Sequence, residues 1–80
     1  MSKTVKVTVG QVAALNMYVF ESIHDEDRPA GLSLNGRTLT VECDANVAAD
    51  YITDAANSAD DSGDRQWCNA LTAVSRAVRS

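Results

Sequence analysis

The sequence predicts one α+β domain that spans residues 1–80, with the element order β-α-β-β-α-α. Three observations predict it: alternating apolar residues near the start, a hairpin signal over residues 32–43, and three segments with apolar residues at helical spacing. A sheet and amphipathic helices bury their apolar faces most simply against each other. We therefore expect a three-stranded sheet with three helices packed on one face.

The first strand is expected to be short and to give way to a helix. Alternation with polar residues places three valines on one side of it: Val5, Val7 and Val9. Thr8 and Gln11 have the spacing of a capping box, which marks a helix start. Apolar residues at helical spacing then continue to about Ile23, and Pro29 favours a loop after that point.

Residues 32–43 carry the clearest local signal in the chain. Asn35-Gly36 is the preferred pair for a type I′ turn, in which both central residues have positive φ. This turn predicts that Leu32 pairs with Leu39 across a two-residue loop. One face of the hairpin is then apolar, with Leu32, Leu34, Leu39, Val41 and Cys43, and the other carries Ser33, Thr38, Thr40 and Glu42.

Two further helices follow the hairpin. Asp44 is a suitable N-cap for a helix through about Ala59, and Ser62 or Asp64 is suitable to cap the next. The first of these helices has a stripe of small residues: Val47, Ala48, Tyr51, Ile52, Ala55, Ala56 and Ala59. Such a stripe allows a neighbour to approach closely. Together with the thin core expected of so short a chain, it suggests a homodimer.

Charge is distributed unevenly along the chain, whose net charge is −4. Residues 21–64 hold all eleven acidic residues and only two arginines, a net charge of −9. A segment of this kind repels phosphate, so nucleic acid is not the partner that composition favours. No run approaches the roughly 18 apolar residues of a membrane span, and residues 1–9 are too polar for a signal peptide.

We therefore expect a cytoplasmic protein that does not enter a membrane. Its two cysteines, Cys43 and Cys68, fit that compartment as free, buried thiols. His24 stands beside three acids, but it has no second nitrogen ligand, so neither a metal site nor a cofactor is expected. Aligning Gly63 with the glycine of a calcium loop puts Ser58 at its first position and Asn69 where that loop requires glutamate, so helix capping and turn formation explain these residues better. No group of residues predicts an enzyme.

The leading hypothesis is a small acidic interaction or regulatory protein that binds a basic surface on a protein partner. Mimicry of nucleic acid is one way to do so, and a phage-encoded inhibitor would fit this size. One alternative is a structural subunit of a homo-oligomer. A second is a weak helix-turn-helix DNA binder that uses Arg65, Gln66 and Asn69. The residues expected to bind the protein partner are Asn46, Asp50, Thr53, Asp54, Asn57, Asp60 and Asp61.

Overall fold

The computed structural model describes residues 2–20 and 29–80. Its elements are β1 (Lys3–Lys6), α1 (Val9–Leu15), the π-helix η1 (Asn16–Phe20), β2 (Leu32–Asn35), β3 (Thr38–Val41), α2 (Ala45–Asp61) and α3 (Arg65–Arg79). This order confirms the predicted α+β fold, with η1 continuing α1 directly. The predicted end of the first helix, residues 21–23, lies outside the described residues.

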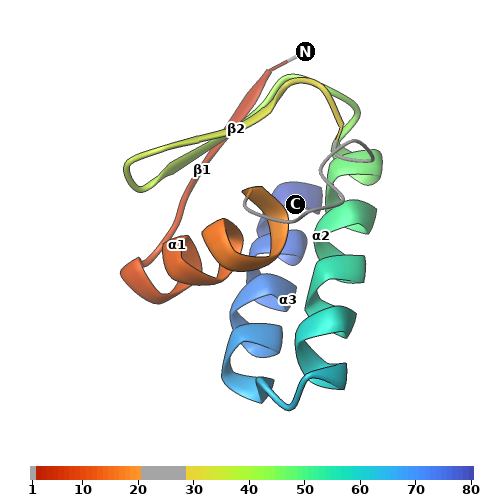
Figure 1. Cartoon of the computed structure of the whole chain (residues 1–80). Helices are drawn as coiled ribbons and strands as arrows, with labels where there is room; N and C mark the ends of the chain where they lie inside the picture. Colours follow the sequence, from red (N-terminus) through yellow and green to blue (C-terminus); the bar gives the residue numbers. More distant parts are fainter. Residues whose placement is uncertain (1, 21–28) are drawn as a thin grey trace.

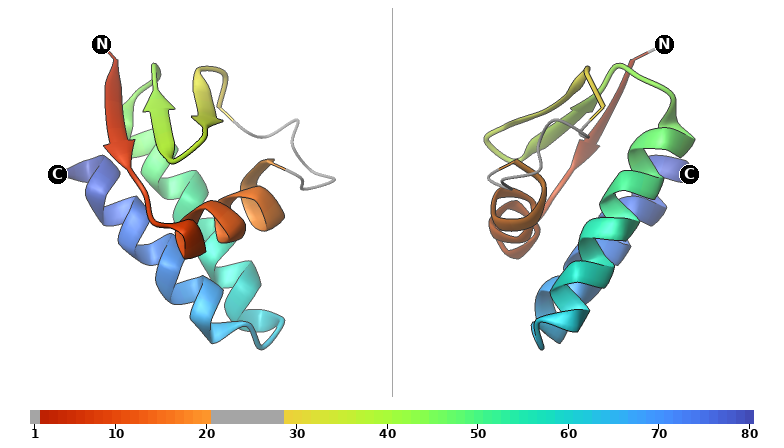
Figure 2. Two further views of the ribbon diagram at one scale, coloured as in Figure 1. Left: turned by 90° about the vertical axis from the view of Figure 1, so that its left-hand side faces the viewer. Right: turned by 45° about the vertical axis from the view of Figure 1, so that its right-hand side comes forward.

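The elements form two layers (Figures 1 and 2). In one layer α2 and α3 run side by side in opposite directions, joined by a tight turn. The other layer holds the sheet, with α1 and η1 beside it against the same helix pair. The sheet is antiparallel throughout, and β3 lies between β1 and β2. The hairpin β2–β3 therefore gains its third strand from the start of the chain.

The sheet is apolar on the face toward the helices and polar on the other, as the alternation predicts. Its buried residues on the inner face are Val5, Leu32, Leu39 and Val41. The outer face carries hydroxyl, amide and amine side chains: Thr4, Lys6, Ser33, Asn35, Thr38 and Thr40. Burying a single face is sufficient to fix which side of each strand points inward.

The predicted type I′ turn and its register are wrong. Asn35 is the last residue of β2 and pairs with Thr38, and the two-residue loop is Gly36-Arg37. Only Gly36 has positive φ, at 62°, which is the pattern of a type II′ turn with glycine first. Leu34 therefore pairs with Leu39. The shift between the two registers is two residues, so each side chain keeps its predicted face.

Replacing Gly36 with valine should lower the free energy of unfolding by more than about 1 kcal/mol. A Cβ at this position would meet no atom within 4 Å, so the cost comes from the positive φ alone. Chemical denaturation would measure the change. Gly10, where a Cβ is equally free of contacts and φ is not positive, provides the matched control as Gly10→Ala. An unchanged midpoint for Gly36→Val would contradict the turn assignment.

The capping box at the start of α1 is confirmed, whereas the predicted burial of Val9 is not. The Gln11 side chain accepts from the Thr8 amide at 2.8 Å, and the Thr8 hydroxyl accepts from the Gln11 amide at 3.2 Å. Since the helix begins at Val9, strand alternation ends at Val7, and Val9 is 69% exposed. The capping hydrogen bonds therefore favour a helix from Val9 onward over a longer strand.

The alanine stripe of α2 is buried within the single chain. Its members Ala48, Ile52, Ala55, Ala56 and Ala59 are all core residues, and the closely packed neighbour is α3. Tyr51 is half-buried, and Val47, which the sequence pattern included in the stripe, is 53% exposed. The stripe therefore allows close approach as predicted, but it is not available as a surface for a second copy.

Candidate functional site

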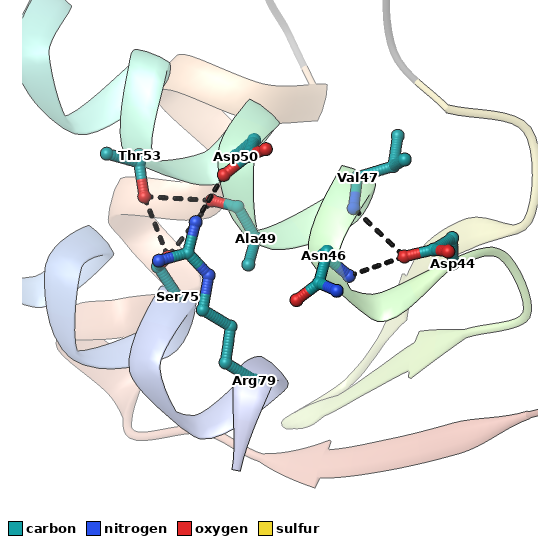
Figure 3. Close-up of polar contacts among 8 residues, drawn as sticks. All are labelled: Asp44, Asn46, Val47, Ala49, Asp50, Thr53, Ser75 and Arg79. Carbon is teal, nitrogen blue, oxygen red and sulfur yellow. Dashed lines mark hydrogen bonds and ion pairs between the residues drawn. The ribbon is translucent and has the colours of Figure 1, made fainter.

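The orientation of α2 is fixed at its first turn. The Asp44 carboxylate accepts from the backbone amides of Asn46 at 2.8 Å and Val47 at 3.4 Å, which confirms the predicted N-cap (Figure 3). With the alanine stripe facing α3 and the sheet, the opposite side of the helix must face outward. This outward side carries the residues predicted to bind a partner.

We use the name acidic ridge for the seven predicted residues, which are Asn46, Asp50, Thr53, Asp54, Asn57, Asp60 and Asp61. Six of them are exposed, and Thr53 is half-buried. Within α2 their spacing places them along one side of the helix. The structure therefore brings the predicted residues together, but it also connects two of them to α3.

The first connection is an ion pair. The Arg79 guanidinium, in the last turn of α3, donates to the Asp50 carboxylate (Figure 3). Both side chains remain exposed, so the pair contributes at most about 1 kcal/mol to stability. Its main effect is on the surface potential, because one of the ridge carboxylates is already neutralised by a cation from the neighbouring helix.

The second connection is a group of three oxygen atoms between the helices. Thr53 Oγ1 and Ser75 Oγ lie 2.7 Å apart, and the Ala49 carbonyl oxygen lies 2.9 Å from the first and 3.0 Å from the second (Figure 3). Ser75 is the one polar residue of the buried core in the described part of the chain, and these contacts satisfy its hydroxyl. Thr53 thus points toward α3 and is structural.

The remaining ridge acids have no basic partner among the described residues. Asp54, Asp60 and Asp61 form no ion pair with any residue in the described ranges. Asp60 and Asp61 also occupy the last turn of α2, which contains no basic residue. The partial negative charge at a helix C-terminus disfavours carboxylates by about 0.3–1 kcal/mol each. These two acids therefore stand where they reduce the stability of their own helix.

A polar contact that sequence reasoning missed lies at the turn between α2 and α3. The Tyr18 hydroxyl donates to Asp64 Oδ2 at 2.5 Å, and the Tyr18 ring meets the Trp67 ring edge-on with centroids 5.7 Å apart. The hydrogen bond to the Asp64 carboxylate raises the pKa of Tyr18. Asp64 is the N-cap residue of α3 but makes no side-chain cap there, and its carboxylate accepts from Tyr18 of η1. Tyr18 belongs to η1 and is 46 residues from Asp64 in the sequence, so no local sequence pattern predicts this hydrogen bond.

The sequence also raised a metal site at His24, a calcium loop around Gly63 and the state of the two cysteines. His24 and its three acidic neighbours lie outside them, and residues 2–20 and 29–80 contain no cluster of potential metal ligands. Ser62 and Gly63, the latter with φ of 84°, form the predicted turn, while residues 58–61 end α2 and residues 65–69 begin α3. Cys43 and Cys68 are free, as predicted, but each is half-buried and not fully enclosed.

The helix pair α2–α3 does not have the crossed arrangement of a DNA-binding helix-turn-helix, whose helices meet at about 90–120°. The two helices run alongside each other in opposite directions over most of their length. Arg65, Gln66 and Asn69 are exposed at the start of α3, next to Asp64.

None of the helices in the described part of the chain has the length and hydropathy to cross a membrane.

Five members of the acidic ridge thus make no hydrogen bond or ion pair with α3 in the described part of the chain, and they form the best-defined candidate surface for a partner. They are Asn46, Asp54, Asn57, Asp60 and Asp61. Searches against protein-family models, curated proteins and solved structures find no match to this chain.

Proposed function

We propose that the protein is a non-enzymatic, cytoplasmic interaction protein whose acidic ridge binds a basic surface on a protein partner. The observation that carries this proposal is the position of Asp60 and Asp61 in the last turn of α2. A helix face that only keeps a domain in solution would gain stability from lysine there. Acids that stand against the helix dipole, without cations nearby on α2, favour a role in binding.

The spacing of the free acids suits a partner with regularly placed cations. Asp54 and Asp61 are separated by seven residues, or roughly 10 Å along the helix axis. Mimicry of a nucleic-acid backbone is one form of such binding, since a row of negative charge attracts lysine and arginine irrespective of sequence. An acidic face of this kind would also raise the association rate in a salt-dependent way.

The double variant Asp54→Lys with Asp61→Lys should abolish capture of the partner while leaving the fold intact. Lysine has a higher helix propensity than aspartate, and it is favoured at the end of α2, so neither change should unfold the domain. Asp50 is left unchanged, because lysine there would face Arg79. The measurement is affinity capture from a lysate of the host at low and high salt, with circular dichroism as the folding check.

The single variants Asp54→Lys and Glu42→Lys provide a charge-matched comparison. Both residues are exposed, but Glu42 follows β3 and is not a member of the ridge. We expect Asp54→Lys to slow association by about tenfold or more and Glu42→Lys to have little effect. If the double variant folds and still captures the partner, the ridge serves solubility only. Binding would then have to involve the open face of the sheet, which includes Ser33, Thr38, Thr40 and Glu42.

A further inference from the structure

A groove of about 500 Å³ lies between the start of α1 and the start of α3. Its apolar lining includes Val9 and Ala13 from α1 and Trp67 and Ala70 from α3. Amide side chains border it, among them those of Gln66 and Asn69. Every side chain that lines the groove is uncharged.

Beyond the groove, exposed apolar residues continue from α1 into η1. Val9, Ala13 and Met17 follow one another at intervals of four residues and are all exposed, with Val9 at 69% and Met17 at 51%. No residue from Val7 to Phe20 carries a charge. Exposed valine and methionine on an uncharged helix differ sharply from the acidic outer side of α2.

We propose that this surface, the α1–α3 groove with Met17, is the contact between two copies of the chain related by a two-fold axis. A charged partner would gain no electrostatic attraction from an uncharged surface. Two copies of this chain repel each other through their net charge of −4, and an uncharged face is where they approach with least repulsion.

The chemistry of the groove border is also self-complementary. A two-fold contact places the same surface opposite itself, so each group must be able to pair with its own kind. Valine, methionine and tryptophan pack against copies of themselves. The carboxamides of Gln66 and Asn69 each carry a donor and an acceptor, so they can pair with the same groups on the second copy.

The size of the molecule is compatible with this contact. A standard interface covers about 800 Å² on each partner, which is about one sixth of the 4892 Å² that the chain exposes. A small domain also gains stability from association by mass action. The acidic ridge lies on α2, and none of its residues lines the groove.

Analytical ultracentrifugation over micromolar to millimolar concentrations tests this proposal. We expect wild type to reach twice the 8.5 kDa of one chain, and Val9→Glu to raise the dimer dissociation constant at least tenfold. Glutamate at the first position of α1 is favoured by the helix dipole, so the variant should fold. Ala13→Glu repeats the test one turn further on.

Val47→Glu is the matched control, since Val47 is a similarly exposed valine that lies on α2, outside the groove. It introduces the same charge and should leave the dimer unchanged. A wild-type chain that stays monomeric at every concentration would overturn the proposal. So would a dimer that persists in both folded groove variants, or one that Val47→Glu weakens to the same extent.

Discussion

Replacing Leu39 with alanine is expected to lower the free energy of unfolding by about 2–5 kcal/mol. Leu39 is fully buried on the central strand β3, where it pairs with Val5 of β1 and Leu34 of β2. Removing most of the Leu39 side chain would leave a cavity under the central strand, which pairs with both β1 and β2. A domain of this length has a total stability of only about 4–12 kcal/mol, so a large part of it would be lost.

Chemical denaturation of the variant measures this loss, and Thr40→Ala is its control. Thr40 is the next residue on β3 and faces the open side of the sheet, so its replacement should cost less than about 1 kcal/mol. Equal losses for the two variants would show that the inner and outer faces of the sheet are assigned incorrectly.

Replacing Ala56 with leucine is expected to destabilise the domain by about 2 kcal/mol or more. Ala56 is buried in the stripe that packs against α3, and overpacking a closely packed core usually costs about 1–3 kcal/mol. The upper part of that range applies here because the added atoms would have to separate two helices that the Thr53–Ser75 contact holds together.

Asn57→Leu provides the comparison for this second variant. It adds leucine one position further along α2, on the exposed side, and should change stability by less than about 0.5 kcal/mol. Denaturant titration of both proteins would measure the difference. An Ala56→Leu variant as stable as wild type would mean that the stripe is not enclosed by α3 and that a second copy could still reach it.

Much of the fold could be predicted because its signals are local. Asp44 caps α2 with its own carboxylate, and Thr8 and Gln11 cap α1 reciprocally, so the starts of α1 and α2 depend only on residues within one turn. Burial of a single sheet face likewise follows from alternation. The turn residues are harder to assign from the sequence. A two-residue loop at Asn35-Gly36 would leave every hairpin side chain on the same face as the observed loop at Gly36-Arg37 does.

The parts that could not be predicted depend on contacts between elements. Helical spacing places Asp50 on the outer side of α2, but it does not show that Arg79 approaches from a neighbouring helix. The same is true of Thr53, whose partner Ser75 is identified only by the alignment of α2 with α3. The π-helical turn at Asn16–Phe20, which places Tyr18 near Asp64, also has no recognisable local signal.

The strand order β1–β3–β2 has a consequence for the kinetics of folding. The hairpin β2–β3 and the helix pair α2–α3 each join neighbours in the sequence, so they can form after short loop closures. The ladder between β1 and β3 instead pairs Lys3 with Val41, residues separated by nearly half the chain. Pairings of this range are slow to form because the entropy of the intervening chain must be lost first. The first strand should therefore join late, after a nucleus built from residues 32–80.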